Sequence, residues 1–457
     1  MRCSNHLGII GLFLCAGGIG ISADLIPAIM PALSEKSPVR IVDGPILLHA
    51  NVAGEWGGHT FCYIVSSDNS VFWSAMLYEP GRTSRTMLLG QYPKKNFGRA
   101  PVVTRVSLDS SDYYNSSLPL LVRTPDGFIH IFVGVTHETG NPNLKPGKLR
   151  YFRSAAPDDI TSIIDRTELI TTNTYNEFHL RMNVGISSDG KKLVWVVLAV
   201  SSDGKVPFNT PVVFFAERKG IDFSFQKAVA YASAMGLFYP QVAVLESSAL
   251  VVGELWDDAK RPHARLMQFD WSGKLLHQED LAPENEGSHC AYDLKAVPAP
   301  GARLGEDAND FILYVTKSPD EHRNCSHEFW AYSSKAMRLH LLRSIATDYS
   351  WSNTGKWLPV SEHESVFINN PSSGQLCVWH GDILGGGDVR RTMLAKSDPV
   401  SIGMQGSYYV MSPSPLVGST QTPGDLYVMT DCPNPGKRAN EVGPCSLLLY
   451  HLALDVR

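Results

Sequence analysis

The sequence predicts an all-β fold and, within that class, a seven-bladed β-propeller. Helical signals are scarce along the 457 residues. Short runs of β-branched and aromatic residues recur instead, and turn sequences such as Pro-Asp-Gly separate them, which is the pattern of successive β-hairpins. The chain is also too long for one ordinary hydrophobic core unless it is built of repeated units. A ring of small sheets satisfies these observations, because radial repetition leaves a long all-β chain without long free edges.

Strand-rich stretches follow one another along the chain. In order, they are residues 59–77, 118–135, 182–200, 239–256, 266–276, 310–317 and 424–430. Asp126-Gly127 and Asp189-Gly190 mark equivalent turns about 63 residues apart, and the Trp271-Ser-Gly turn is expected to be the next in the series, about 83 residues further on. Units of about 60 residues divide roughly 430 mature residues into seven blades. A double-layer sandwich or a parallel β-helix is the alternative architecture.

The first 23 residues are typical of a signal peptide. Arg2 gives a positive start, residues 8–21 form an apolar run, and Ile21-Ser22-Ala23 offers a small residue for cleavage. A membrane span needs about 20 apolar residues, and no later segment approaches that length. We therefore expect a secreted or periplasmic protein, free of the membrane after cleavage, with a single propeller domain over residues 24–457. An uncleaved N-terminal anchor is the alternative.

Six cysteines follow the predicted signal peptide, and an even number in an exported chain suggests disulfide bonds. They are Cys62, Cys290, Cys325, Cys377, Cys432 and Cys445. Cys432 and Cys445 bracket a loop rich in Pro and Gly and are the best candidate pair, while the other pairings stay open. None of the cysteines has zinc-site spacing. The sequence therefore predicts no metal site and no cofactor, and it does not indicate structural calcium.

The composition argues against nucleic acid as a partner. Hydrophobic residues make up 44% of the chain, charged residues 19%, and the formal net charge is -5. No Lys/Arg run or basic stretch offers the positive surface that phosphate backbones require. We expect a monomeric globular protein whose contacts with any acidic polymer come from a few local Arg and His residues.

Polar and aromatic clusters stand just before or just after several predicted strands. They are Asp112–Asn115, Thr136–Glu138, Thr174–His179 with Arg181, Phe238–Pro240, and Asp257–His263. In a propeller the strand ends of different blades gather around one face and the central channel. Clusters from separate blades can therefore form one site.

Four of these stretches carry a family resemblance. Gly134-Val-Thr-His137, then Leu149–Ile160 within LRYFRSAAPDDITS, then Thr174–Phe178 and later Phe238–Pro240 follow one another in order. In that order and spacing the chain resembles a secreted family of seven-bladed propellers that includes ulvan lyases, rhamnose–glucuronate lyases and related rhamnosidases. The resemblance covers roughly residues 100–270. One turn, Ser187–Trp195, also resembles loosely the Asp-box turn of sialidase-type propellers.

The resemblance implies β-elimination next to a uronic acid in an acidic polysaccharide. The proton at C5 of a uronate is too weakly acidic to remove until a cation or strong donor neutralises the adjacent carboxylate. On this account His137 is the base, Tyr175 assists it, and an arginine neutralises the carboxylate with its fixed fork of donors. Arg181 is the candidate for that arginine.

Further residues of the clusters are candidates for binding the sugar chain. They are Tyr114, Asn115, His179, Tyr239 and Arg261.

The chain also departs from the family pattern. Asp112-Tyr113-Tyr114-Asn115 stands where the family has Asp-x-His-Asn, so the first histidine is missing. Val200-Ser201-Ser202 stands where an arginine is expected. A glycoside hydrolase of the same superfamily and a non-catalytic carbohydrate-binding propeller are therefore the alternatives to a lyase. Asp257 and Asp258 make poor partners for two-carboxylate hydrolysis, because adjacent strand residues point to opposite faces.

Each candidate also has a structural explanation. A histidine at a strand end is often structural, Tyr175 would suit the core of a propeller, and Tyr239 would suit the packing of a turn. His130 lies within an alternating strand pattern and is expected to be packed. Arg150 and Arg153 are expected to tie neighbouring blades by ion pairs.

Overall fold

A computed structural model describes most of the strand-forming chain. The described residues are 30–31, 39–54, 64–79, 85–95, 99–108, 119–136, 147–170, 178–199, 210–231, 237–256, 262–281, 289–298, 311–318, 323–349, 356–359, 365–369, 375–382, 386–396, 409–411, 425–433 and 443–454. The predicted signal peptide lies outside these ranges. Within them, no helix is long and apolar enough to cross a membrane.

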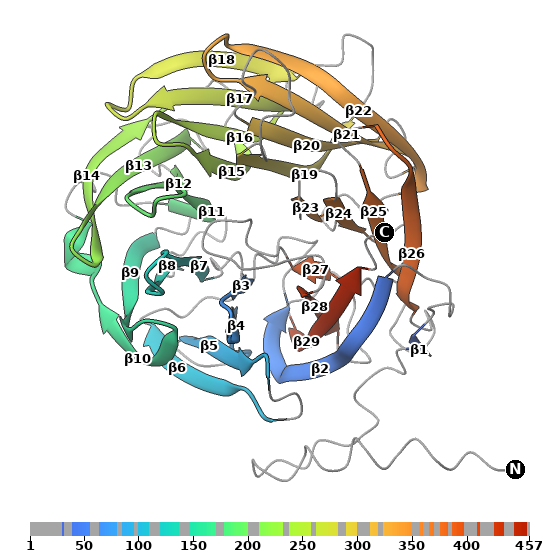
Figure 1. Cartoon of the computed structure of the whole chain (residues 1–457). Helices are drawn as coiled ribbons and strands as arrows, with labels where there is room; N and C mark the ends of the chain where they lie inside the picture. Colours follow the sequence, from blue (N-terminus) through green and yellow to red (C-terminus); the bar gives the residue numbers. More distant parts are fainter. Residues whose placement is uncertain are drawn as a thin grey trace, which may run out of the picture.

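The described strands form seven antiparallel sheets arranged as a ring (Figure 1). In five of the sheets the strands follow sequence order outward, so the first strand of a blade borders the centre of the ring and the fourth lies at the rim, whereas in the other two a strand from near the start of the chain, β1 or β2, is added at the rim. The prediction of an all-β, seven-bladed propeller is confirmed. The ring forms because the sequence consists of short, repeated hairpin units, and no such unit can bury its apolar faces without a neighbour.

The blades are numbered here in ring order. Blade 1 has β3 (Ile64–Ser66), β4 (Ser70–Met76), β5 (Arg85–Pro93) and β6 (Val102–Leu108). Blade 2 has β7 (Leu120–Arg123), β8 (Ile129–Thr136), β9 (Gly147–Ala156) and β10 (Asp159–Asp165), followed by the 3-10 turn η4 (Thr167–Leu169). Blade 3 has β11 (Phe178–Ile186), β12 (Lys192–Ala199), β13 (Thr210–Lys219) and β14 (Asp222–Ala230).

The remaining blades complete the circle. Blade 4 has β15 (Phe238–Val244), β16 (Ser248–Trp256), β17 (Pro262–Asp270) and β18 (Leu275–Leu281). Blade 5 has β19 (His289–Pro298), β20 (Phe311–Ser318), β21 (Arg323–Ser333) and β22 (Arg338–Tyr349). Blade 6 has β23 (Lys356–Pro359), β24 (Ser365–Asn369), β25 (Gln375–Gly381) and β26 (Val389–Lys396), with β1 (Met30–Pro31) beside β26. Blade 7 has β27 (Tyr409–Met411), β28 (Leu426–Pro433), β29 (Gly443–Leu454) and, at its rim, β2 (Val39–Gly54).

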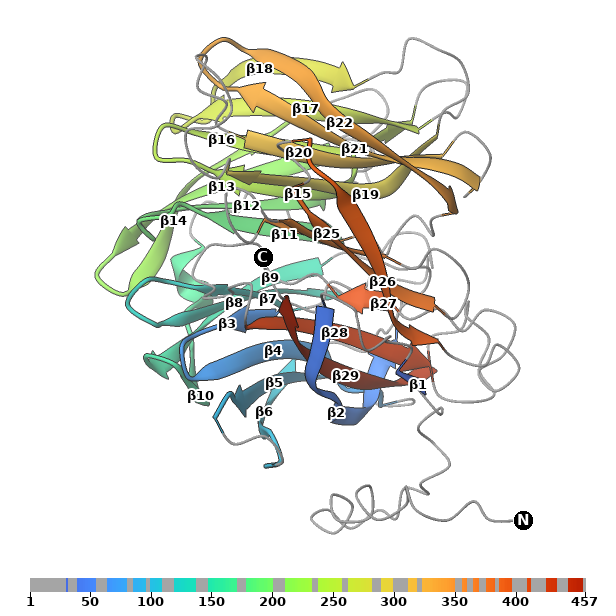
Figure 2. The ribbon, with the colours of Figure 1, turned by 45° about the vertical axis from the view of Figure 1, so that its right-hand side comes forward.

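Blade 7 joins the two ends of the chain. Strand β2 pairs antiparallel with β29 from Val39 opposite Leu454 to Gly54 opposite Gly443, and the two strands lie side by side in both views (Figures 1 and 2). The closure turns a linear series of blades into a ring. Cys432 of β28 and Cys445 of β29 lie on neighbouring strands, but Cys432 is opposite Ser446 and Cys445 is opposite Pro433. Their disulfide bond stays a prediction.

The turn signals in the sequence belong to two kinds of connection. Asp126-Gly127 joins the first and second strands of blade 2, and Asp189-Gly190 does the same in blade 3. Each aspartate accepts a hydrogen bond from a hydroxyl two residues before it, and each glycine has a positive φ (+89° and +70°). The Trp271-Ser-Gly turn is different, because it joins the third and fourth strands of blade 4. The expectation that this turn is equivalent to those at Gly127 and Gly190 is therefore wrong. The sequences look alike because Gly273 also has a positive φ, a conformation that tight turns of either kind often require and that glycine adopts easily.

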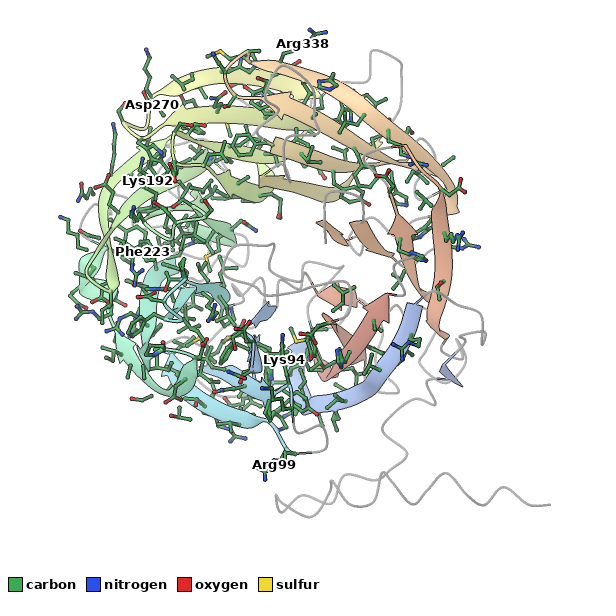
Figure 3. The ribbon with its side chains drawn as sticks, in the orientation of Figure 1. Lys94, Arg99, Lys192, Phe223, Asp270 and Arg338 are labelled. Carbon is green, nitrogen blue, oxygen red and sulfur yellow. The ribbon has the colours of Figure 1, made fainter. Side chains whose placement is uncertain are left out.

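The core lies between neighbouring blades, as the side chains drawn in Figure 3 show. Strand β4 is buried over its whole length, and the apolar run of β12 is buried from Leu193 to Leu198. Between blades 2 and 3 the ring of Phe132 stacks on Tyr151 with centroids 5.0 Å apart and contacts Trp195 at 5.2 Å. Both faces of β4 and β12 are covered, so these two middle strands are largely apolar without alternation.

Polar contacts between blades gather on one face of the ring. This lower face carries the turns between first and second strands and between third and fourth strands. Arg153 of β9 donates to Asp222 at the third turn of blade 3 (2.6 Å), as Arg166 does (2.8 Å). Gln91 and Gln268 reach the corresponding turns of blades 2 and 5 through backbone carbonyls. One type of contact therefore recurs at three interfaces.

Other blade interfaces use lysine. Lys192, labelled in Figure 3, donates to the carbonyl of Glu246 in blade 4 (2.6 Å) and lies over the ring of Trp271. Lys94 of blade 1, also labelled, pairs with Asp425 of blade 7 at 2.6 Å. Burial opposes ionisation of Asp425, but hydrogen bonds from His451 and Lys94 hold its pKa below the ordinary value. Lys94 thus ties the first blade to the last.

Arg153 forms the predicted ion pair between blades, and Arg150 pairs with an aspartate of its own blade. Arg153 joins blade 2 to blade 3 through Asp222. Arg150 donates to Asp165 at 2.5 Å, and both residues belong to blade 2. This pair therefore joins the third and fourth strands of one sheet.

Replacing Asp222 should weaken the interface between blades 2 and 3. The Asp222→Ala variant leaves the buried guanidinium of Arg153 without its carboxylate, so we expect the free energy of unfolding to fall by about 3 kcal/mol. Urea denaturation measures the change. Glu168→Ala is the control, because Glu168 is an exposed partner of Arg166 and its loss should cost less than about 1 kcal/mol. Equal losses in both variants would contradict the prediction.

Two buried histidines should make the fold sensitive to acid. His130 is fully buried, as its strand pattern predicted, and its Nδ1 lies 2.8 Å from the hydroxyl of Tyr151. The Tyr151 hydroxyl accepts a hydrogen bond from the backbone N–H of Phe223, so it can donate its own proton in a hydrogen bond to Nδ1 of His130. Burial, with a smaller contribution from nearby arginines, lowers the pKa of His130 to about 3, and burial lowers that of His327 to about 3 as well.

Both pKa values lie below the unfolded value of 6.5, so protons bind the unfolded chain preferentially between pH 6.5 and pH 3. Stability is present above pH 6.5 and is lost as the pH falls through this window, by about 2 kcal/mol for each histidine at pH 5. His130→Gln keeps an acceptor for Tyr151 but cannot titrate. We expect the slope of unfolding free energy against pH to decrease by about one proton at pH 5. A wild-type slope in this variant would show that His130 does not contribute.

Candidate functional site on the upper face

The face opposite the lower face, called the upper face here, carries the connections between second and third strands and between successive blades. Strands alternate in direction within each sheet, so these two kinds of connection emerge at the same edge. The end of β8 at Thr136, the start of β11 at Phe178, the start of β15 at Phe238 and the end of β16 at Trp256 all lie there. Blades 2, 3 and 4 thus bring together strand ends from well-separated parts of the sequence.

Five of the sequence-predicted site residues lie outside the described residues: Tyr114, Asn115, His137, Tyr175 and Arg261. Each belongs, in sequence, to a segment whose two flanking strands end on the upper face. The predicted roles of these five residues are not tested by the described part of the molecule.

The other three predicted residues lie in inner strands whose backbone is described. His179 and Arg181 belong to β11, and Tyr239 belongs to β15. β11 packs against β7 of blade 2 and β15 of blade 4, so these positions belong to adjacent inner strands. The inner strands β7, β11 and β15 border the centre of the ring in Figure 1.

The upper ends of both strands contain β-bulges. In β11 the register passes from His179 opposite Leu198 to Met182 opposite Val197, so Leu180 and Arg181 are extra residues. In β15 it passes from Phe238 opposite Glu254 to Gln241 opposite Val252, so Tyr239 and Pro240 share one opposing position. Bulges change the direction of local side chains and are over-represented next to active sites. Two residues predicted from sequence patterns, Arg181 and Tyr239, therefore occupy bulges.

Contacts just below the bulges hold these strand ends in place. The indole N–H of buried Trp195 donates to the sulfur of Met182 at 3.3 Å. The side-chain amide of Asn183, also buried, donates to the Oε1 of Gln241 at 3.4 Å and so links β11 to β15. Residues on either side of the blade 3–blade 4 interface are thereby fixed at the base of the upper face.

The close approach of these strands depends on glycine at position 185. A Cβ on Gly185 would lie 2.9 Å from a methyl of Val242, 3.0 Å from one of Val244 and 3.1 Å from the carbonyl oxygen of Val242. These neighbours are a short branched side chain and backbone, neither of which moves easily. Only a residue without a side chain allows the two inner strands to pack this closely.

A buried carboxyl group next to the β15 bulge escaped the sequence analysis. Glu254 lies opposite Phe238 near the end of β16 and is fully buried. Buried carboxyl groups are costly and gather at functional sites. The signal was present, because Glu254 interrupts the apolar run VVGELW, but the run was interpreted only as a strand.

Within the described ranges, no group of three or more His, Cys, Asp or Glu side chains could hold a metal ion.

Comparison with known proteins gives the same fold. No protein-family model matches the chain, and no curated protein sequence matches it. Among solved structures, the chain is similar to an ulvan lyase of polysaccharide lyase family 25, with 11% identity over 89% of this chain and 95% of that chain and a TM-score of 0.57. The shared fold is a β-propeller. A structure of an ulvan lyase of the same family bound to -[GlcA(1-4)Rha3S]- gives a TM-score of 0.56 at the same identity and coverage. At this identity the likeness establishes the fold alone.

Substituting Gly185 should disturb the packing of β11 against β15 near the lower ends of these strands. We expect Gly185→Ala to lower the free energy of unfolding by about 1–3 kcal/mol, because the added methyl overpacks the space between β11 and β15. Urea denaturation measures the loss, and the crystal structure of the variant would show the two strands farther apart. In a control, Gly220→Ala, nothing lies within 4 Å of the added carbon, and only the positive φ opposes the change. An unaltered stability of Gly185→Ala would contradict the overpacking.

Proposed function

We propose that this protein is an exported polysaccharide lyase that cleaves an acidic polysaccharide next to a uronic acid by β-elimination. The observation that carries the proposal is the convergence of the strand ends of blades 2, 3 and 4 on the upper face. The segments that contain His137 and Tyr175 connect strands at this face, and Arg181 belongs to β11, the inner strand of blade 3 that begins directly after the segment of Tyr175. The fold shared with an ulvan lyase supports the same class of substrate.

The proposed mechanism needs three groups around one uronate. Arg181 binds the carboxylate and withdraws charge from it, which makes the C5 proton more acidic. His137, neutral at the start, removes that proton. The electrons form a C4–C5 double bond as the bond from C4 to the glycosidic oxygen breaks, and Tyr175 supplies a proton to the departing oxygen. The products are an unsaturated uronate and a new chain end, so atoms and electrons balance without a cofactor.

The remaining predicted residues would bind the flanking sugars. Tyr114, Tyr239 and the ring of His179 offer flat surfaces for the apolar faces of pyranose rings, and Asn115 and Arg261 offer hydrogen bonds to hydroxyl or acidic groups. The β15 bulge supports a binding role for Tyr239, because a bulge is a common means of directing a side chain toward a ligand.

A non-catalytic carbohydrate-binding propeller is the second candidate. The observation that favours it is the pair of departures from the lyase pattern: Tyr114 stands where a histidine is expected, and Val200-Ser201-Ser202 stands where an arginine is expected. A glycoside hydrolase on the same fold is the third possibility.

Elimination can be distinguished from the alternatives by its product. The C4–C5 double bond conjugated to the carboxylate absorbs near-ultraviolet light, whereas hydrolysis gives reducing ends without that absorbance and a binding protein gives neither. We expect the purified protein to raise the absorbance of at least one polymer among ulvan, gum arabic, pectin and glycosaminoglycans. His137→Ala should reduce the rate at least about 100-fold, because a general base typically contributes that much.

The matched control is His277→Ala, since His277 lies on β18 at the rim of blade 4. It should keep the wild-type rate, and both variants should keep a melting temperature close to that of the wild type. Full activity in His137→Ala would exclude His137 as the base. New reducing ends without absorbance would identify a hydrolase instead.

A further inference from the structure

One ring nitrogen of the buried His130, between blades 2 and 3, has no partner among the described residues. Its Nδ1 accepts a hydrogen bond from the hydroxyl of Tyr151 (2.8 Å), and the fully buried Phe223, labelled in Figure 3, packs against the ring with centroids 4.8 Å apart. The ring is neutral at pH 7, because its pKa is about 3. Its single proton therefore lies on Nε2. This Nε2–H is buried and has no hydrogen-bond acceptor in the described part of the chain, which includes all the turns at the lower ends of blades 2 and 3.

Two arginines cross the same interface in opposite directions. Arg153 of blade 2 donates to Asp222 of blade 3 (2.6 Å), and Arg218 of blade 3 donates to Asp126 of blade 2. These two arginines and two aspartates are the charged groups that act on the pKa of His130. They therefore surround its ring on the lower face.

The charged groups at this interface supply more donors than acceptors. The Nε–H of Arg218 is buried and has no acceptor among the described residues, and the same is true of the Nε–H of Arg166, the second partner of Asp222. Three arginines thus share two aspartates, Asp126 and Asp222, while the remaining carboxylate partner, Glu168, is exposed. Buried N–H groups without acceptors are costly. The interface therefore carries more positive charge and more N–H donors than its own carboxylates balance.

We propose that the Nε2–H of His130 and the Nε–H of Arg218 bind one small monovalent anion, such as chloride, between blades 2 and 3 on the lower face. A halide accepts hydrogen bonds from several donors and needs no acceptor in return, whereas a water molecule in the same place has two protons of its own to donate. The excess of guanidinium charge favours an anion as well. One donor comes from each blade, so the ion joins the two blades as the ion pairs beside it do. The anion site is independent of the proposed lyase activity.

Bromide, a heavier halide, tests the site directly. A crystal of the full chain grown without chloride and soaked in sodium bromide should give an anomalous difference peak in contact with both nitrogen atoms. In solution, chloride replaces gluconate at constant ionic strength, and urea denaturation measures the unfolding equilibrium constant. Because the ion binds only the folded chain, we expect this constant to fall about 10-fold when chloride reaches ten times its dissociation constant.

Arg218→Lys tests one of the two donors. Lysine keeps the positive charge beside Asp126 but has no Nε–H, so we expect the affinity for chloride to fall at least about 10-fold. His130→Leu removes the other donor and should weaken binding by a similar factor. The matched control is Arg123→Lys on the same face, because the Nε of Arg123 already donates to Asp158 (2.6 Å). This control should keep the wild-type dependence on chloride.

The readout is the dependence of unfolding on chloride rather than the absolute stability. A substitution that only destabilises the fold therefore lowers stability by the same amount at every chloride concentration. A bound water only would give no bromide peak and no chloride dependence in the wild type, and either result would overturn the anion site. A wild-type chloride dependence in Arg218→Lys or in His130→Leu would overturn the assignment of that residue as a donor.

Discussion

The pairing of β2 with β29 is the constraint on which the rest of the structure depends. A series of blades that buries each sheet against the next leaves two uncovered apolar faces unless the series closes. Strand β2, near the start of the chain, completes the blade that β27, β28 and β29 begin near its end. Closure brings blade 1 against blade 7, where Lys94 and Asp425 form a partly buried ion pair. Every blade then has a neighbour on both sides.

The two faces of the closed ring carry different kinds of connection. The lower face carries tight turns and a repeated set of contacts between blades, in which Arg153, Gln91 and Gln268 reach the third turn of the next blade. The upper face carries the connections to which the sequence assigned its aromatic and titratable clusters. This division is common in folds that support many chemistries.

Below the upper face, packing defines where the inner strands can lie. Gly185 permits β11 to approach β15 near the lower ends of the two strands, whereas nearer their upper ends Trp195 donates to Met182 and Asn183 donates to Gln241 across the blade interface. The bulges of β11 and β15 follow directly above Met182 and Gln241. A substrate on the upper face would therefore meet irregular backbone supported by a closely packed base, which is the arrangement that holds binding groups in one geometry.

The sequence by itself determined the class of secondary structure, the repeated hairpins and the number of blades. Those features follow from local patterns: Gly127 and Gly190 mark turns because only their backbones adopt positive φ at no cost, and the apolar run of β12 marks a strand covered on both faces. The burial of His130 was equally visible in its strand pattern.

Only the tertiary structure decided which blade supplies the partner of a charged side chain, and where the register between two paired strands shifts. Arg150 and Arg153 look alike in sequence, yet one pairs within its sheet and the other across an interface. The bulges at Arg181 and Tyr239 could not be predicted either, because an extra residue is defined by the strand opposite it, and the pairing of strands is a property of the tertiary structure.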